Sequence, residues 1–216
     1  MPEPFSPIAT TIFRLVLWGL VAALAFSLWI GFLVVRSPYE MVQANPREQP
    51  VPFSHEHHVG GLGIDCRYCH VSVEVSSFAD IPPTSICLNC HSQIWAVAPP
   101  LEPVRESYRV GRSIQWTKVY QLPDYVYFDH SIHIHKGIGC SSCHGRVDEM
   151  PLTWQAPPLT MSWCLECHRH PEKYVRPKSD VFNASYTQPA DQEAVGRRLV
   201  KQYNIHSLTS CSICHR

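Results

Sequence analysis

The sequence predicts a mainly α-helical protein with little regular secondary structure: one membrane-spanning helix near the N-terminus, followed by one small domain. Three observations lead to this fold class. Residues 15–35 form a run of 21 residues without a charge. The pentapeptide Cys-x-x-Cys-His occurs five times and uses all 10 cysteines. Nineteen prolines interrupt the remaining chain, and proline cannot continue a helix. We therefore expect the helices of the domain to be short turns that carry the cysteine pairs.

The uncharged run from Leu15 to Val35 is bounded by Arg14 and Arg36. At about 1.5 Å per residue, a helix of this length crosses the roughly 30 Å hydrocarbon core of a bilayer. A cleaved signal peptide is the alternative, because residues 23–25 (Ala-Leu-Ala) resemble a cleavage site. That site lies in the middle of the run, with ten further residues beyond it. We therefore expect a retained membrane anchor.

The pentapeptide Cys-x-x-Cys-His is typical of c-type haem attachment. Its two thiols add across the vinyl groups of the porphyrin, and the histidine ligates the iron from the proximal side. We number the five motifs site 1 to site 5 in chain order. They comprise Cys66, Cys69 and His70; Cys87, Cys90 and His91; Cys140, Cys143 and His144; Cys164, Cys167 and His168; and Cys211, Cys214 and His215. Five covalently bound haems are the expected cofactors.

Structural zinc and disulfides are the alternatives for these cysteines. Seventeen residues separate Cys69 from Cys87 and twenty separate Cys143 from Cys164, spacings that also occur in zinc sites. Site 5 would then lack a second cysteine pair, although structural zinc takes four ligands. Histidine is only 13 of 216 residues, so chance does not place one after all five pairs. Disulfides leave these histidines unexplained as well, and two-residue spacing is poor disulfide geometry.

The expected domain organisation follows from the number of residues available for each haem. Beyond residue 36 there are 180 residues, or 36 for each haem. So short a chain cannot enclose five macrocycles in a conventional core, so we expect a multihaem cytochrome c domain whose core is the haems. The predicted parts are a cytoplasmic stub with the anchor (1–36), a juxtamembrane linker (37–52) and the haem domain (53–216). A formal charge of zero indicates no nucleic-acid partner.

An internal repeat predicts the ligands on the distal side of the iron. Phe-x-His-x-x-His precedes sites 1 and 2 and again precedes sites 3 and 4, which gives two-haem repeats at about 53–91 and 128–168. The fifth haem belongs to residues 205–216. Histidines three residues apart share one face of a helical turn and can therefore serve two neighbouring haems. The predicted distal ligands are His55, His58, His130 and His133. His57 and His135 fall outside the pattern and are expected at the surface or a haem edge.

The distal ligand of the fifth haem is less well determined by the sequence. Met161 lies three residues before Cys164, and methionine ligation would raise the reduction potential of the haem. We choose Met161, while His206, His170 and Met150 remain open. The alternative role for Met161 is packing against a porphyrin face, which methionine does well.

The histidine pairs followed by Cys-x-x-Cys-His resemble the class III multihaem cytochromes. Residues 52–70, 128–133 and 161–168 are further similar to the pentahaem subunit of alternative complex III. The resemblance covers nearly the whole chain. A related assembly in sulfate reducers has a six-haem subunit, and the five motifs here argue against it.

The resemblance implies an electron carrier that is not an enzyme by itself. Its complex oxidises menaquinol, in respiration or photosynthesis, and contains an iron–sulfur subunit, polytopic quinol-binding membrane subunits and a monohaem cytochrome c. Electrons would pass from the iron–sulfur clusters through the five haems to the monohaem cytochrome or a soluble periplasmic acceptor. Because c-type haem is attached outside the bacterial cytoplasmic membrane, we expect a single-pass protein of that membrane with a periplasmic haem domain.

Three other functions are less consistent with the sequence. A membrane-anchored quinol dehydrogenase that feeds a periplasmic reductase usually has its first haem nearer the membrane, whereas thirty residues separate Val35 from Cys66. A multihaem reductase needs an open iron position, yet all five motifs end in histidine and spare ligands are available. A haem sensor would not need five haems.

Overall fold

The computed structural model describes residues 6–41 and 43–215. The first five residues of the expected cytoplasmic stub, Val42 in the expected linker and Arg216 in the site 5 segment lie outside the described residues. The chain divides into two compact units, Met1–Gln43 and Ala44–Arg216, which we describe separately. The finer boundaries expected from the sequence remain predictions.

The first unit contains the long helix α1, Pro7–Val35. It begins where the Ser6 hydroxyl accepts a hydrogen bond from the Ala9 amide at 3.3 Å, and its first residue is proline. Such a start suits helices because proline at the first position sacrifices no intrahelical hydrogen bond. None of its described residues is buried, and its mean hydropathy is 2.2 over the most apolar window. By length and composition α1 can cross a membrane, a test that a signal sequence would also meet.

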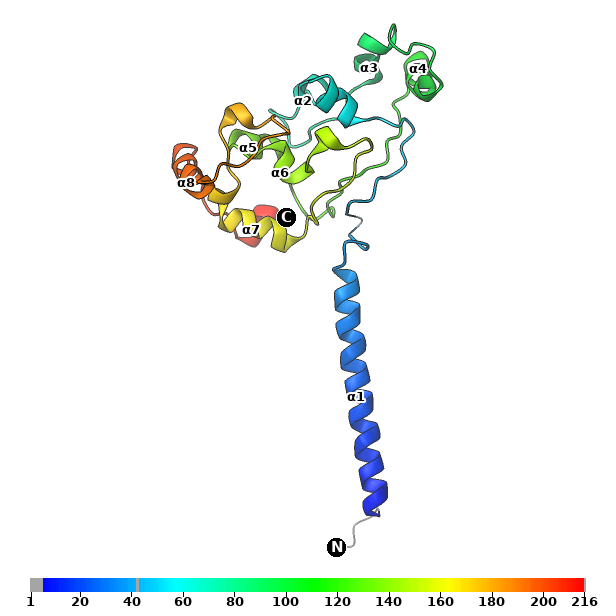
Figure 1. The fold of residues 1–216 in the computed structure, drawn as a ribbon, viewed down its shortest axis with the longest axis vertical. Coiled ribbons are helices and arrows are strands. Elements are labelled where there is room, and N and C mark those ends of the chain that lie inside the picture. Colours follow the sequence, from blue (N-terminus) through cyan, green and yellow to red (C-terminus); the bar gives the residue numbers. More distant parts are fainter. Residues whose placement is uncertain (1–5, 42, 216) are drawn as a thin grey trace. The chain divides into compact units, whose positions relative to one another are not determined.

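The second unit is a series of short helices joined by irregular segments (Figure 1). Its α-helices are α2 (Cys66–Cys69), α3 (Thr84–His91), α4 (Glu102–Val110), α5 (His130–His135), α6 (Cys140–His144), α7 (Met161–Arg169), α8 (Gln192–Gln202) and α9 (Cys211–Cys214). Its other helical turns are η1 (Glu56–Gly61), η2 (Pro99–Leu101), η3 (Val147–Glu149), η4 (Pro171–Lys173) and η5 (Lys178–Asp180).

Regular pairing of extended segments is almost absent from the described part of the chain. Isolated bridges join Val126 with His215 and Ile138 with Val175. The predicted fold class is therefore confirmed: a mostly helical chain with a long apolar N-terminal helix and much irregular structure.

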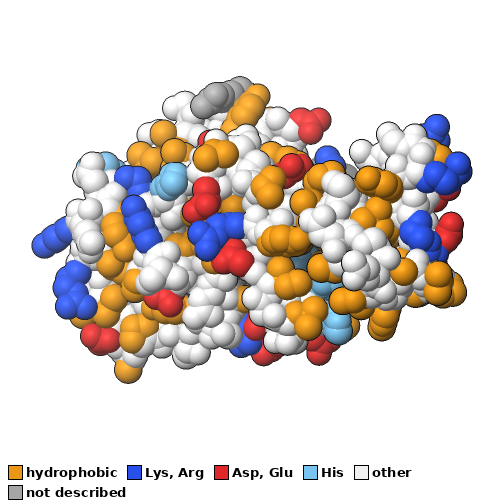
Figure 2. All heavy atoms as spheres, turned by 90° about the horizontal axis from the view of Figure 1, so that it is seen from above, with side chains coloured by type: hydrophobic (Ala, Val, Ile, Leu, Met, Phe, Trp, Pro, Cys, Tyr) orange, Lys and Arg blue, Asp and Glu red, His pale blue; other side chains and the backbone are white. Residues whose placement is uncertain are grey.

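The polypeptide of the second unit provides only a small hydrophobic core of its own. Among the described residues, the buried core cluster consists of Val73, Ile134 and Val181, with Ala79 and Phe182 packed against it. Many hydrophobic side chains lie instead at the surface, and histidines appear among them in Figure 2. Small domains with so little buried apolar surface usually depend on covalent or metal cross-links.

Two close approaches of backbone segments pack the parts of this unit together. Gly60 of η1 lies so near the Asp148 carbonyl of η3 that a Cβ at Gly60 would overlap it. The Glu56 amide of η1 also donates to the Met150 carbonyl at 3.0 Å. In the second close approach, Gly196 of α8 lies against η4, and a Cβ at Gly196 would overlap the Glu172 carbonyl. The first contact joins the two predicted repeats.

Candidate functional site

Each Cys-x-x-Cys-His motif lies on a short helical turn, in α2, α3, α6, α7 or α9. In such a turn the cysteines at i and i+3 and the histidine at i+4 share one face. At site 1 the His70 amide donates to the Cys66 carbonyl at 2.9 Å, and at site 5 the His215 amide donates to the Cys211 carbonyl at the same distance. None of the ten cysteines is joined to another by a disulfide. Each turn thus presents two thiols and one imidazole to the same side.

The starts of these helices explain why the motifs adopt helical turns. The carboxylate of Asp65 accepts a hydrogen bond from the Arg67 amide at 2.8 Å at the start of α2. The hydroxyl of Thr160 accepts from the Trp163 amide at 3.4 Å at the start of α7. Such side-chain caps stabilise a helix by about 0.5–2 kcal/mol. These two caps fix the starts of α2 and α7, and with them the direction of the thiols at sites 1 and 4.

Three of the predicted distal histidines lie opposite the proximal histidine of one site. The ring centroids of His58 and His91 are 6.1 Å apart. Those of His133 and His168 are 6.2 Å apart. For the third pair, His130 and His144 of site 3, the distance is 6.3 Å. Two metal–nitrogen bonds of about 2 Å, with about 1 Å from each nitrogen to its ring centre, give a separation of about 6 Å. The spacing therefore suits two imidazoles on opposite sides of one iron.

The fourth predicted distal histidine, His55, is placed beside site 1 by its electrostatics. Burial lowers the pKa of His55 to about 4, and His70 is the next contributor, ahead of His58. The first histidine of each pair is thus associated with the first site of its repeat, and the second histidine with the second site. The sequence repeat is therefore also a repeat of side-chain positions.

Main-chain carbonyls hold most of these imidazoles by the Nδ1 atom. The distances run from 2.6 Å, between His133 and the Asp129 carbonyl, to 3.2 Å, between His215 and the Tyr125 carbonyl. The same contact holds His58, His70, His91 and His130, on the carbonyls of Ser54, Asp80, Ile94 and Ser77. A carbonyl can only accept, so Nδ1 carries the proton and Nε2 keeps its lone pair for a metal.

Phenylalanine completes each histidine pair, which explains its place in the motif. The ring of Phe53 stacks on His58 at 4.5 Å between centroids and meets His55 edge-on at 4.9 Å. The ring of Phe128 stacks on His133 at 4.4 Å and meets His130 edge-on at 4.8 Å. Aromatic contacts of this kind restrict ring rotation and contribute about 0.5–1.5 kcal/mol. The two repeats use the same arrangement.

Burial favours the neutral form of two imidazoles at sites 3 and 4. Burial lowers the pKa of His144 to about 4, with further contributions from His130, His70 and His55. Burial also lowers the pKa of His133. A neutral imidazole has the lone pair that iron requires, so these environments favour metal binding over protonation.

The candidates for the fifth distal ligand lie in different surroundings. Met161 is the first residue of α7 and is 67% exposed, whereas Met150 is 2% exposed. His170 lies 3.6 Å from the carboxylate of Glu172, and His206 is exposed. The choice of Met161 remains a prediction.

Contacts between the motif turns give their order in space. Asn89 of site 2 donates to the Tyr68 hydroxyl of site 1 at 3.0 Å. Site 1 adjoins site 3, since the Cys66 thiol and the Cys140 amide contact the neighbouring carbonyls of residues 182 and 181 at 3.7 and 3.1 Å. Sites 4 and 5 are linked where the Ser207 hydroxyl donates to the carbonyl of His168 at 3.0 Å.

Interactions between thiols complete this order. Burial raises the pKa of Cys143 to about 12, and the neighbouring Cys167 and Cys164 thiols of site 4 raise it further. Burial raises the pKa of Cys164 as well, with Cys214 of site 5 the next contributor. The five motif turns therefore follow one another in the order 2–1–3–4–5.

Sequence reasoning missed several residues that position the ligands. The hydroxyl of Thr153 contacts Nδ1 of His55 at 2.9 Å from 98 residues away. Arg176 contacts both serines between the cysteines of site 3. No local pattern marks either residue, because both contacts join distant segments. The two histidines outside the repeat pattern, His57 and His135, are exposed as expected.

The fold and the site together fit a domain that binds several c-type haems, because they combine paired thiols, neutral imidazoles and paired rings about 6 Å apart. No protein-family model matches the sequence. The chain is 35% identical over 127 residues to the menaquinone reductase multihaem cytochrome c subunit of Nitratidesulfovibrio vulgaris. The match covers 58% of this chain and 56% of the relative, so it spans about half of the length of each. The motifs and this similarity both suggest that the domain binds several c-type haems.

Proposed function

We propose that the protein is the electron-transfer subunit of a membrane-bound quinone oxidoreductase complex and carries five c-type haems. The observation that carries the proposal is the set of opposed imidazole pairs, whose Nδ1 atoms are held by the protein and whose Nε2 atoms are left for iron. When bound, each haem supplies a reversible one-electron iron couple. The chain's own residues hold that couple in place and set its surroundings.

The roles of the residues follow from their positions on the turns. The ten cysteines attach the haems, two at each site, and the five motif histidines are the proximal ligands. The distal ligand at site 1 is His55 and that at site 2 is His58. His130 serves site 3 and His133 serves site 4. For site 5 we propose Met161, whose thioether would favour the ferrous state.

Closed coordination supports electron transfer rather than catalysis at iron. An enzyme that reduces a substrate at haem iron needs an open position, whereas sites 1 to 4 each have an imidazole available on both sides. Neutral, hydrogen-bonded imidazoles hold the same positions in both oxidation states, which suits rapid one-electron exchange. The protein then acts as a carrier within a larger quinone-reactive complex.

The series 2–1–3–4–5 supports conduction along the whole domain. Each site in this series adjoins the next, and sites 2 and 5 lie at its two ends. Electrons would enter near one end and leave near the other, from iron–sulfur clusters to a monohaem cytochrome or a soluble acceptor. Helix α1 would anchor the subunit in the cytoplasmic membrane, with the haem domain on the periplasmic side.

Two directions of electron flow are candidates. The resemblance of residues 52–70, 128–133 and 161–168 to alternative complex III favours menaquinol oxidation, with polytopic quinol-binding subunits as partners. The printed name of the relative, a menaquinone reductase subunit, favours flow toward the quinone. The same carrier can serve either direction, because the potentials of its partners decide the sign. We propose menaquinol oxidation and retain quinone reduction as the second candidate.

Purification from detergent-solubilised native membranes tests the proposal. An affinity tag after residue 216 should isolate a complex that contains an iron–sulfur subunit and polytopic membrane subunits, and menaquinol should reduce its haems. Reduction of menaquinone by the reduced complex, without the reverse reaction, would establish the second candidate. A monomeric tagged protein without haem would contradict the proposal altogether.

A further inference from the structure

Arg176 is a buried cation that forms no ion pair within the described part of the chain. Its side chain is 5% exposed, and no ion pair to it occurs among the described residues. Its Nη1 atom donates to the carbonyls of Asp180 and Asn183 at 3.4 and 3.2 Å, and its Nη2 atom donates to two serine hydroxyls. The guanidinium carbon lies 4.5 Å from the ring centroid of Tyr186. All of these partners are formally neutral.

The two serines place this charge against site 3. They are Ser141 and Ser142, the residues between Cys140 and Cys143, and each hydroxyl accepts from Nη2 at 3.0 Å. Of the five motifs, only site 3 has hydroxyls at both intervening positions. Gly139 completes the arrangement, since a Cβ there would overlap the guanidinium. The backbone of Arg176 is fixed as well, because its amide donates to the Gly137 carbonyl at 2.9 Å.

A buried charge without a counter-ion is costly, so a protein rarely retains one without a reason. The Nε atom of Arg176 is buried and has no hydrogen-bond partner within the described chain. Burial lowers the pKa of Arg176, and Tyr186, Cys140, Asp180 and Cys143 oppose that shift. The guanidinium nevertheless stays protonated in proteins. The positive charge therefore persists beside the site 3 thiols at every working pH.

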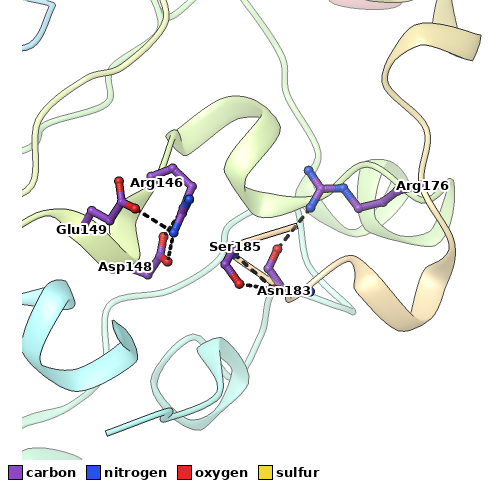
Figure 3. A network of polar contacts seen from close by, with 6 residues as sticks. All are labelled: Arg146, Asp148, Glu149, Arg176, Asn183 and Ser185. Carbon is purple, nitrogen blue, oxygen red and sulfur yellow. Dashed lines mark hydrogen bonds and ion pairs between the residues drawn. The ribbon is translucent and has the colours of Figure 1, made fainter. Parts of the chain in front are cut away.

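Arg146 provides the contrast within the same region. It follows site 3 by two residues, its side chain is 45% exposed, and it pairs with Asp148 at 2.7 Å and Glu149 at 2.8 Å. Figure 3 shows both arginines: Arg146 is paired with the carboxylates of Asp148 and Glu149, and Arg176 contacts Asn183. The charge of Arg146 is paired and screened by water, whereas the charge of Arg176 is buried and lacks an ion pair among the described residues. Two cations near one site thus differ in their electrostatic effect.

We propose that Arg176 is a positioning residue that raises the reduction potential of the haem attached at site 3 by fixing a buried positive charge against its attachment turn. Reduction adds one electron to ferric iron and gives ferrous iron, while no bond changes at Arg176 and its proton stays in place. The nearby cation stabilises the added negative charge. This inference rests on the proposed function, in which the electron comes ultimately from a quinol or from a neighbouring reduced haem.

The size of the effect follows from Coulomb's law. A unit charge about 10 Å away, in surroundings of effective dielectric constant about 20, changes a one-electron equilibrium on the order of tenfold. For a one-electron couple a tenfold change corresponds to about 59 mV. Site 3 lies in the middle of the order 2–1–3–4–5, where both repeats meet. Its potential therefore governs how readily an electron passes from one repeat to the other.

The test is a redox titration of the full-length, haem-loaded protein in detergent, with dithionite as reductant. Arg176→Met and Arg176→Gln should each lower one of the five midpoint potentials by about 59 mV, which corresponds to a tenfold change in the equilibrium constant of reduction. The apolar Met variant avoids leaving polar atoms buried without partners, so it protects against misfolding. Arg176→Lys keeps the charge and should retain most of the wild-type potential. Arg146→Gln is the matched control. It should change the equilibrium constant of reduction of every haem by less than twofold.

Three results would overturn the inference. The first is a full set of unchanged potentials in both neutral variants with five haems present by mass. The second is an equal fall in Arg146→Gln, which would indicate a general effect of net charge. The third is loss of the site 3 haem from the neutral variants but not from Arg176→Lys, which would give the arginine a role in attachment. A wild-type protein without five haems would instead contradict the proposed function.

Discussion

The two repeats, residues 53–91 and 128–168, hold their histidine pairs in the same way but lie in different surroundings. In both, a phenylalanine stacks on the second histidine and meets the first edge-on. In the first repeat the pair opens a π-helical turn, η1, and in the second it lies in the α-helix α5. The spacing from the first histidine to the next cysteine is 11 residues in one repeat and 10 in the other. The local cluster therefore tolerates a change of backbone.

The surroundings of sites 3 and 2 differ in how much the chain covers them. The residues of site 3 are half-buried, and burial lowers the pKa of His144 and raises the pKa of Cys143. After site 2 the chain instead exposes apolar side chains, with Ile94 62%, Trp95 67% and Val97 89% exposed. We infer that local sequence determines ligation, whereas nonlocal packing determines how the sites differ in potential.

Removal of one attachment pair should have the largest effect and should differ between the repeats. The double variants C140A/C143A and C87A/C90A should each lose the mass of one haem. We expect the site 3 variant to lose about 2–5 kcal/mol of stability, as small domains do when a native cross-link is removed. The site 2 variant should lose less, because its turn contacts fewer distant segments. Mass spectrometry and thermal unfolding measure both, and equal destabilisation would contradict the difference that we infer.

Removal of a distal imidazole should have the same effect in both repeats. His58→Ala and His133→Ala should each convert one haem from low spin to high spin, because one iron loses a strong-field ligand, and should allow carbon monoxide to bind. Electron paramagnetic resonance and optical spectra monitor both changes. His57→Ala is the control, since His57 is exposed beside His58 with its ring centroid 5.4 Å away. An unchanged low-spin spectrum in both test variants would show that other ligands were at work.

Substitution of Met161 should change a midpoint potential, whereas substitution at the corresponding position of the first repeat should not. Thr84 occupies the corresponding position in the first repeat, three residues before Cys87, the first cysteine of site 2. Met161→His should lower one midpoint potential by at least about 59 mV, a tenfold change in the equilibrium constant of reduction, while the haem stays low-spin. Thr84→His should leave all five unchanged. If no potential moves in Met161→His, the ligand is another residue, and His206 is tested next.

Loss of the Thr153 hydroxyl should give the smallest effect, confined to the first repeat. In Thr153→Val the Nδ1 atom of His55 loses its partner, at a cost of about 0.5–1.5 kcal/mol. The imidazole then becomes a weaker donor, so the potential of site 1 should rise slightly. A matched exchange at Ser162, whose hydroxyl contacts Thr160 rather than an imidazole, should change no potential. A shift of equal size there would contradict the specific role of Thr153.

The sequence could predict the parts of the site that depend on near neighbours. The five motif turns follow from two-residue spacing, and the histidine pairs follow from a repeated pattern with a phenylalanine. The helix α1 follows from an uncharged run of sufficient length. In each case the residues that make the contact lie within a few positions of one another, so local geometry determines the outcome.

The remaining features depend on contacts that no local pattern encodes. Arg176 meets the serines of site 3 from 34 and 35 residues away, and Thr153 meets His55 across the two repeats. The order 2–1–3–4–5 differs from the order along the chain because the site 1 turn lies between those of sites 2 and 3. Gly60 gave no sequence signal either, although its lack of a side chain lets η1 approach η3.

The carbonyl acceptors of the imidazoles have a consequence for how this protein can diverge. Six of the seven Nδ1 contacts described here are made to the main chain, so the residue type at the acceptor position is free to vary. Substitution at Ser54 or Ser77 leaves the acceptor oxygen where it is. Substitutions can therefore accumulate at these acceptor positions without changing the orientation of the imidazole rings. Only His55 relies on a side chain, and Thr153 is the position where substitution should be least tolerated.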